Sequence, residues 1–290
     1  MYAITAITGQ VGGATARQLL AAGKKVRGIV RDPSKAAHWE KLGVELVQGD
    51  WNDVAALTAA FEGTAGVFVM APPNFAPAPG YPEAIAITNA FRSALDSAKP
   101  AKVVALSSVG AHRREGLGLI TQCRILEDAL AGIQIPHAFV RAGWFMENAQ
   151  WDVPSARENG SLDAYLSPLD AKYPLVSTAD IGAQIARVLG ENWTDKRIIE
   201  LEGPARYSSN DCAAAFSVVL NRAVTPKIVP RDSWAALFES QGTPPDRIAP
   251  RIEMLDGFNS GWIDFEGGSG VEPVRGTTTL QAAYQQLVAR

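Results

Sequence analysis

The chain has 290 residues, of which 47% are hydrophobic and 20% charged, and its formal net charge is −3. This length and composition exclude a disordered protein and indicate one large domain, or one domain with a smaller lobe, around a sizeable apolar core. The chain has no excess of basic residues, so its composition does not predict nucleic-acid binding. Its two cysteines, Cys123 and Cys212, are too few for a disulfide framework. Because the N-terminus shows neither a charged leader nor a long apolar segment, we expect a cytoplasmic protein without membrane association.

The first thirty residues predict a strand, a glycine turn and a helix. An apolar strand is expected from Ile4 to Thr8, and the turn 9–13 leads into a helix from Ala14 to Ala22. Small residues in such a turn let backbone N–H groups approach a pyrophosphate, and the start of a helix favours negative charge. The pattern therefore predicts a dinucleotide site, and its alternative is a structural turn without a ligand.

Strand and helix patterns then alternate as far as Val140. Strands are predicted at 26–30, 44–47, 66–70, 102–106 and 137–140, and helices at about 33–42, 52–61, 83–98 and 117–131. Together with the opening unit, this makes six strand–helix units. We therefore predict an α/β fold with a Rossmann-type, doubly wound parallel sheet.

Beyond Arg141 the alternation is less regular. Helices are predicted near 147–158, 178–189, 209–220 and 232–241, a strand at 197–201, and a loop over the glycine-rich segment 257–276. We expect residues 1–145 to form an NAD(P)-binding Rossmann domain. Residues 146–290 are expected to form a smaller C-terminal α/β substrate lobe, from which some segments, such as 173–201, return to the main sheet.

Four motifs at the predicted strand ends resemble the NmrA-like branch of the atypical short-chain dehydrogenases. They are Thr8-Gly9-Gln10-Val11-Gly12, VRDPSK at 30–35, QGD at 48–50, and RAGWFMEN at 141–148. Within that branch the pattern is most similar to quinone oxidoreductases and triphenylmethane reductases, over about the first 190 residues and more loosely beyond them. The resemblance implies a reductase that binds a nicotinamide nucleotide. It also shows a departure, because the family's three glycines correspond here to Ala6, Gly9 and Gly12, and a Cβ at the first position is unfavourable if the turn requires positive φ.

The end of the second predicted strand bears on the choice of cofactor. Arg31 stands where a guanidinium would pair with the 2′-phosphate of NADP, whereas a carboxylate there would favour NAD. We therefore expect NADP(H), with NAD(H) as the alternative that Asp32 would serve if it were not a helix cap; Arg31 itself has a simpler interpretation as a surface residue. Asp50 resembles the family residue near the adenine, or it caps the next helix. The predicted cofactor-binding residues are Thr8, Gly9, Gln10, Val11, Gly12, Arg31, Asp50, Trp51, Met70, Ala71, Pro72, Ser107 and Arg124.

The tyrosines narrow the chemistry. None of the six is followed four residues later by lysine, although that spacing supplies the acid of ordinary short-chain dehydrogenases. Hydride transfer to a quinone gives a weakly basic phenolate that solvent can protonate, so an electron-poor conjugated acceptor fits better than a simple ketone. The predicted catalytic residues are Ser107 and Ser108 as hydrogen-bond donors, His112 as a proton relay and Arg124 as a ribose or oxyanion ligand. Their alternatives are strand-end hydrogen bonding, a polar surface histidine, and an ion pair with Glu127 or Asp128.

Aromatic residues define the predicted acceptor pocket. Five prolines stiffen the segment 72–82, which we expect to present Phe75 or Tyr81 to the acceptor, unless it only connects a strand to a helix. A second wall is predicted at Trp144, Phe145 and Asn148, with Trp262 closing the pocket from the smaller lobe. The first two of these are otherwise ordinary core residues. Scattered histidines and cysteines give no metal-ligand spacing, so no metal is expected.

These observations favour an NADPH-dependent oxidoreductase that passes hydride to a quinone or similar acceptor. One alternative is a non-catalytic NADP(H)-binding redox sensor that acts through a protein partner, and another is an isomerase or biosynthetic reductase for a natural product. The expected partner is an aromatic or conjugated small molecule, and the expected state a monomer or homodimer.

Overall fold

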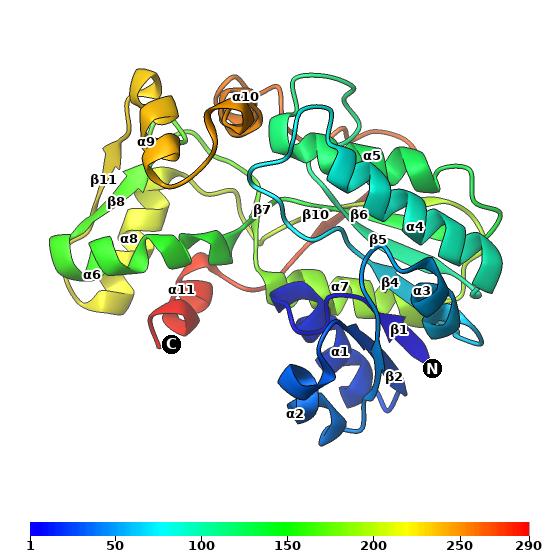
Figure 1. The fold of residues 1–290 in the computed structure, drawn as a ribbon. Coiled ribbons are helices and arrows are strands. Elements are labelled where there is room, and N and C mark those ends of the chain that lie inside the picture. The colour runs from blue at the N-terminus through cyan, green and yellow to red at the C-terminus, as the bar shows by residue number, and fades with distance from the viewer. Residues whose placement is uncertain (290) are drawn as a thin grey trace.

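An eight-stranded parallel sheet forms the centre of the computed structural model, which describes residues 1–289 (Figure 1). The strand order is β12-β10-β6-β5-β4-β1-β2-β3, so the winding reverses beside β1. This arrangement confirms the predicted doubly wound α/β fold. The strands are β1 (Tyr2–Ile4), β2 (Val26–Val30), β3 (Glu45–Gln48), β4 (Gly66–Val69), β5 (Val103–Ser108), β6 (His137–Ala142), β10 (Arg197–Glu202) and β12 (Glu272–Arg275).

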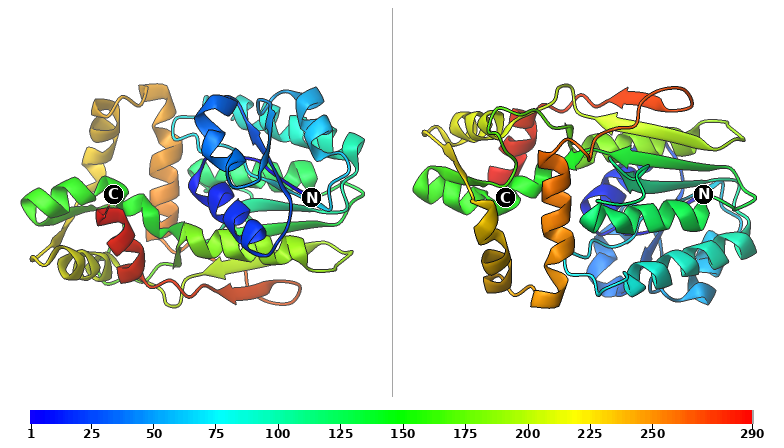
Figure 2. Two further views of the ribbon diagram at one scale, coloured as in Figure 1. Left: turned by 90° about the horizontal axis from the view of Figure 1, so that it is seen from below. Right: turned by 90° about the horizontal axis from the view of Figure 1, so that it is seen from above.

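Helices cover both faces of the sheet and create two apolar cores (Figure 2). One face packs against α1 (Gln10–Ala21), α2 (Ala37–Glu40) and α7 (Thr178–Gly190), and the other against α3 (Val54–Phe61), α4 (Pro82–Ala98) and α5 (Thr121–Leu130). Strand β4 shows why its sequence has almost no polar residues. Phe68 enters the first core while Val67 and Val69 enter the second, since both faces of the strand are covered.

The smaller lobe lies beyond the carboxyl ends of these strands (Figures 1 and 2). Its main core contains the stacked rings of Phe216 and Tyr284, whose centroids are 4.4 Å apart, and a second core surrounds Trp234 and Phe238. Its helices and strands are β7 (Trp144–Phe145), α6 (Val153–Asn159), β8 (Ser161–Ala164), β9 (Leu175–Val176), α8 (Ser209–Leu220), β11 (Thr225–Ile228), α9 (Trp234–Ser240), α10 (Ala249–Asn259) and α11 (Leu280–Val288). The described chain also contains the short 3₁₀ turns η1 (Pro33–Ala36), η2 (Gly118–Ile120), η3 (Met146–Trp151), η4 (Arg231–Ser233) and η5 (Pro245–Arg247).

The second half of the chain also contributes to the sheet. Strand β10 pairs with β6, and β12 pairs with β10 at the edge. The prediction of a loop over 257–276 was therefore wrong at both ends, since α10 continues to Asn259 and β12 begins at Glu272. A four-residue strand that contains proline carries too weak a pattern to be recognised. The division of the chain at residue 145 stays a prediction.

Two predicted elements near the N-terminus are shorter than expected. The first strand ends at Ile4 rather than Thr8, because residues 5–8 already form the turn. The helix expected from Pro33 to Leu42 is a 3₁₀ turn, η1, followed by only the four residues of α2. None of the helices within residues 1–289 is both long enough and apolar enough to cross a lipid bilayer.

Candidate cofactor and active site

The turn between β1 and α1 provides an open helix N-terminus. Helix α1 has Gly9 as its N-cap, without a side-chain cap and without an acidic residue in the first turn. Thr8, Gly9 and Gln10 are exposed, whereas Val11 and Gly12 are buried. A Cβ on Gly12 would lie only 2.2 Å from the carbonyl oxygen of Ala6, so this position requires glycine. The first N–H groups of the helix are therefore available to an anion.

Ala6 adopts a left-handed backbone conformation, with φ of +51°. Its carbonyl accepts a hydrogen bond from the Gly9 N–H at 2.8 Å and fixes the turn. An L-residue with a Cβ pays about 1–2 kcal/mol for this conformation. Alanine at this position therefore adopts the left-handed conformation of the turn at the expense of backbone strain.

We predict that Ala6→Gly stabilises the protein. Relief of the strain, less the larger entropy of glycine in the unfolded chain, leaves a gain of about 0.5–1 kcal/mol in the free energy of unfolding. Urea denaturation measures it. At Ala36, buried with negative φ, the same change should destabilise, and a loss of stability in Ala6→Gly would contradict the strain.

Arg31 lines an open pocket at the carboxyl ends of β2 and β3. The pocket has a volume of about 400 Å³ and is also lined by Gln48, Gly49, Asp50 and Asp53. The Gln48 amide donates to the Arg31 carbonyl at 3.2 Å. Within residues 1–289, no carboxylate forms an ion pair with the Arg31 guanidinium. Its charge is therefore available to an anionic ligand.

The neighbouring carboxylates have different roles. Asp32 caps η1, since its Oδ1 accepts from the Ser34 N–H at 3.1 Å and from the Ser34 hydroxyl at 2.6 Å, which lowers the pKa of Asp32 below its ordinary value. Asp53, rather than Asp50, caps α3 by accepting from the N–H of Ala56 at 2.9 Å. The cap interpretation of Asp50 for α3 is thus wrong, and its side chain is exposed in the pocket. Trp51 packs edge-on against Phe91.

The proline-rich segment after β4 forms hydrogen bonds with both the loop region after β5 and the smaller lobe. Met70, Ala71 and Pro72 are half-buried at its start. The Tyr81 hydroxyl donates to the Gly118 carbonyl at 2.9 Å, and the Ala76 carbonyl accepts from Arg247 at 3.3 Å. The segment is thus tied to η2 and to the smaller lobe. Phe75 remains 58% exposed, so it is a free apolar surface on this segment.

A buried charge network lies at the ends of β5 and β6. Arg141 donates twice to Glu127 of α5, through Nε and Nη2, each at 2.9 Å. Ser107 donates its hydroxyl proton to the same carboxylate at 2.6 Å. All three side chains are buried. Since its proton is directed to Glu127, Ser107 has only acceptor capacity left, while Ser108 is half-buried beside it.

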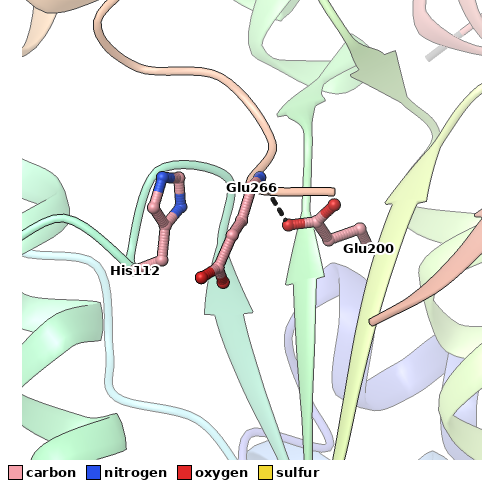
Figure 3. Close-up of side chains that lie close together, drawn as sticks. All are labelled: His112, Glu200 and Glu266. Carbon is pink, nitrogen blue, oxygen red and sulfur yellow. Dashed lines mark hydrogen bonds between the residues drawn. The ribbon is translucent and has the colours of Figure 1, made fainter. Parts of the chain in front are cut away.

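The network continues to the C-terminal part of the chain (Figure 3). Glu266 accepts from Arg141 Nη1 at 2.7 Å, and buried Glu200 accepts from the backbone N–H groups of Glu266 and Gly267 at 2.7 and 3.1 Å. His112, Glu200 and Glu266 present ligand atoms within 4.8 Å of one another. Arg141 already supplies positive charge to both carboxylates, so this grouping does not require a metal ion to balance it.

His112 lies beside these carboxylates without a hydrogen-bond partner for its Nδ1. Burial lowers the pKa of His112 below its ordinary value, an effect that nearby Glu266 opposes. Arg124 forms an ion pair with Asp128, its Nε lying 2.9 Å from Oδ2, and its Nη1 lies 3.4 Å from the carbonyl oxygens of Ala111 and His112. The structure thus contains the ion pair with Asp128, and a role of Arg124 toward a cofactor or an oxyanion stays a prediction.

The remaining predicted acceptor residues lie between the sheet and the smaller lobe. Trp144 packs edge-on against Phe258 with ring centroids 5.2 Å apart, and Phe145 is half-buried against the main core. Asn148 is exposed. Trp262 is 40% exposed, and its indole N–H donates to the Glu115 carbonyl at 3.0 Å. Trp262 therefore lies beside the loop that follows β5, whereas Trp144 and Phe145 pack against the cores of the smaller lobe and of the sheet.

Sequence reasoning did not find the ionic network, although it had singled out Arg141 as a strand-end residue. An arginine directly after the apolar run 137–140 is a signal for a buried ion pair. Its partners Glu127 and Glu266 are 14 and 125 residues away in the sequence. Sequence spacing gives no means of choosing them among the acidic residues.

A doubly wound parallel sheet with an uncapped helix N-terminus after β1 and an unpaired arginine after β2 defines a protein of the dinucleotide-binding Rossmann class. The family model for the NmrA-like family matches residues 2–258. The chain therefore belongs to the NmrA-like family, as its motifs predicted.

Individual relatives extend over most or all of the chain. Quinone oxidoreductase 2 of Escherichia coli is 28% identical over 99% of this chain and 98% of its own length. Its structure in complex with NADPH superposes with a TM-score of 0.76 and covers 99% of each chain at 25% identity. The NAD(P)H azoreductase of Xenophilus azovorans is 25% identical over 77% of this chain and 75% of its own. Triphenylmethane reductase of Citrobacter sp. shares the fold, with a TM-score of 0.80 over 100% of this chain and 99% of its own at 20% identity.

Proposed function

We propose that this protein is an NADPH-dependent reductase whose acceptor is a quinone or a similar electron-poor conjugated molecule. The observation that carries the proposal is the combination of the open N-terminus of α1 with Arg31, which has no ion pair within residues 1–289, both at the carboxyl ends of the parallel strands. The names of the relatives support the same chemistry, because they describe reductases of quinones and azo compounds.

The chain's own groups fit the two ends of such a cofactor. The N–H groups of residues 10–12 would hold the diphosphate, and Arg31 would hold the 2′-phosphate, with Asp50 beside the adenosine. A bound nicotinamide nucleotide would supply a hydride, and residues at the ends of β5 and β6 would hold its nicotinamide end. There the Ser107 oxygen would accept a hydrogen bond from the carboxamide, since its own O–H donates to Glu127. Half-buried Trp144 and Phe145 would position a flat acceptor and exclude water.

His112 is the proposed proton source for the reduced acceptor. It lies next to Glu266, whose carboxylate is 45% exposed and connects it to solvent. Burial lowers the pKa of His112, so the residue must take up a proton before it can donate one, and the nearby Glu266 carboxylate favours that protonated form. Because the phenolate formed by hydride transfer to a quinone is weakly basic, the absence of the tyrosine–lysine pair from the sequence is compatible with turnover.

Turnover with a panel of quinones, azo dyes and enones tests the proposal. We expect oxidation of NADPH, followed at 340 nm, that depends on the acceptor. Tight NADPH binding without oxidation across the panel would contradict the reductase and favour the redox-sensing regulator, for which the engagement of Ser107 and Arg124 with carboxylates would then be structural.

We predict that Arg31→Ala weakens NADPH binding by about 10- to 100-fold, because charge-assisted hydrogen bonds contribute about 1.5–3 kcal/mol. NADH lacks the 2′-phosphate, so its affinity should change less than about threefold. Isothermal titration calorimetry with both nucleotides measures the two constants.

The matched control for Arg31 is Arg231→Ala, which removes an exposed arginine that pairs with Asp256 in the smaller lobe. Both nucleotides should bind this variant as they bind the parent protein. Equal losses of NADPH and NADH affinity in Arg31→Ala would exclude recognition of the 2′-phosphate by Arg31.

A further inference from the structure

The segment 261–270 crosses the carboxyl ends of β5, β6 and β10 on its way from α10 to β12. We propose that this segment, here named the clasp, opens and closes as a unit over the acceptor end of the site, and that Glu266 latches it to Arg141. The proposal rests on the proposed function only in that the entering molecule is taken to be the electron acceptor. Opening itself is a property of the chain without any ligand.

Glycines at both ends give the clasp its hinges. Gly261 is its first residue, with φ of +75°, and Gly267, Gly268 and Gly270 stand at its C-terminal end, with φ between +64° and +86°. A Cβ on any of these four would meet no atom within 4 Å. They are therefore glycines for backbone conformation and not for packing, as a hinge requires.

Between the hinges, the clasp is held mainly by polar contacts. Trp262 donates to the Glu115 carbonyl and stacks under the Arg113 guanidinium at 4.1 Å, and Asp264 forms two hydrogen bonds of 2.8 Å with Arg206. Only Ile263 is deeply buried. Partly exposed ion pairs contribute about 0–1 kcal/mol each, so such a segment opens at a lower free energy than the sheet.

The fixed side of the contact keeps its partners when the clasp opens. Arg141 remains bound to Glu127 by two hydrogen bonds, and Glu200 remains 4.0 Å from the Arg141 guanidinium while gaining access to water. The main barrier to separating buried ionic groups is the cost of leaving a buried charge without a partner. Opening of the clasp leaves no such charge. The ionic network thus permits two states of the segment.

Two unsatisfied polar atoms lie under the closed clasp. His112 Nδ1 and Arg113 Nε are both buried without a hydrogen-bond partner. They belong to adjacent residues of the loop after β5; His112 lies next to Glu266, and the Arg113 guanidinium stacks on the Trp262 ring. A buried group without a partner costs about 1–3 kcal/mol, which opposes closure until water or a polar acceptor atom reaches them. These atoms favour an opening that admits a polar ligand to this loop.

Amide hydrogen exchange of the full chain, without cofactor or acceptor, tests the clasp. The N–H groups of Glu266 and Gly267 bond outside the clasp, to Glu200, and report its opening. We expect them to exchange at least tenfold faster than the core amides of β5. Glu266→Gln keeps the shape but weakens the latch, so it should accelerate these amides about tenfold further and leave the β5 amides unchanged.

Glu272→Gln is the matched control, since Glu272 lies just beyond the clasp and pairs with Arg197 instead. It should leave the exchange of the clasp unchanged. Exchange of Glu266 and Gly267 only together with the β5 core, or no effect of Glu266→Gln, would overturn the proposal.

Kinetics separate the clasp from the proposed function. If the protein reduces an acceptor, Glu266→Gln should raise the KM for the acceptor severalfold and leave the NADPH dissociation constant unchanged. The readout is KM and not kcat, because Glu266 also lies beside His112, the proposed proton source. Faster exchange with an unchanged KM would overturn the role of the clasp in acceptor entry. If the protein shows no turnover, the proposed function fails, and the exchange experiment still decides whether the clasp opens.

Discussion

Replacing Gly12 with alanine should lower NADPH affinity by at least about 100-fold, which corresponds to about 2.7 kcal/mol. The added methyl would lie 2.2 Å from the Ala6 oxygen and 2.8 Å from the Thr5 oxygen. Both are backbone atoms, so the turn must move away from α1, and the N–H groups of residues 10–12 lose their common direction. Ala6 is already strained and cannot absorb the shift cheaply. Calorimetric titration with NADPH measures the loss, and circular dichroism establishes that the variant is folded.

Gly190→Ala provides the matched control for Gly12. Gly190 is the last residue of α7, and a Cβ there would meet no atom within 4 Å. This variant should bind NADPH as the parent does and be equally or slightly more stable. Normal NADPH binding by a folded Gly12→Ala protein would remove the glycine turn from the cofactor site.

Glu127→Gln should reduce the free energy of unfolding by about 3 kcal/mol, because it removes the carboxylate charge that binds buried Arg141 through two hydrogen bonds. Within residues 1–289, this leaves only Glu266 and the more distant Glu200 as ionic partners of Arg141. Arg141 and Glu127 are 4% and 5% exposed, so water cannot replace the lost carboxylate. The carboxamide keeps one acceptor oxygen, and its NH2 group would face a donor of Arg141 or Ser107. For a chain of this size, the expected fall in Tm is roughly 6–12 °C. Thermal denaturation by circular dichroism measures it.

The neighbouring Asp128→Asn is the control for this variant. Asp128 lies on the same helix and pairs with Arg124, but it is 56% exposed, so its loss should change stability by less than about 1 kcal/mol. Equal effects of the two substitutions would show that the buried network contributes no more than a surface ion pair. Retention of full stability in Glu127→Gln would contradict the network directly.

The alternating units of the first half were predictable because each has a strong local pattern. Asp32 before Pro33 carries the signature of an N-cap, and the structure places its carboxylate on Ser34. Helix α8 was predicted with its observed bounds, since Ser208 and Asp211 form a capping box. Both signals lie within four residues.

Elements that depend on distant partners were missed or misplaced. Strand β12 becomes a strand by pairing with β10, more than 70 residues earlier, and its own sequence contains proline. Strands β8 and β11 likewise form only with each other. Ser107 was expected to donate a hydrogen bond to a ligand, yet its hydroxyl donates to Glu127 of the next helix. Local sequence has no information on such contacts.

The sequence by itself determined the doubly wound sheet, the family and the position of the nucleotide turn, because hydrophobic periodicity and short glycine and capping motifs act within a few residues. Only the tertiary structure decided which charges meet. It joined Glu127, Arg141, Glu200 and Glu266 into one buried network and placed the segment 261–270 over it. The physical reason is that an ion pair depends on distance in space, and the fold brings together residues separated by up to 125 positions.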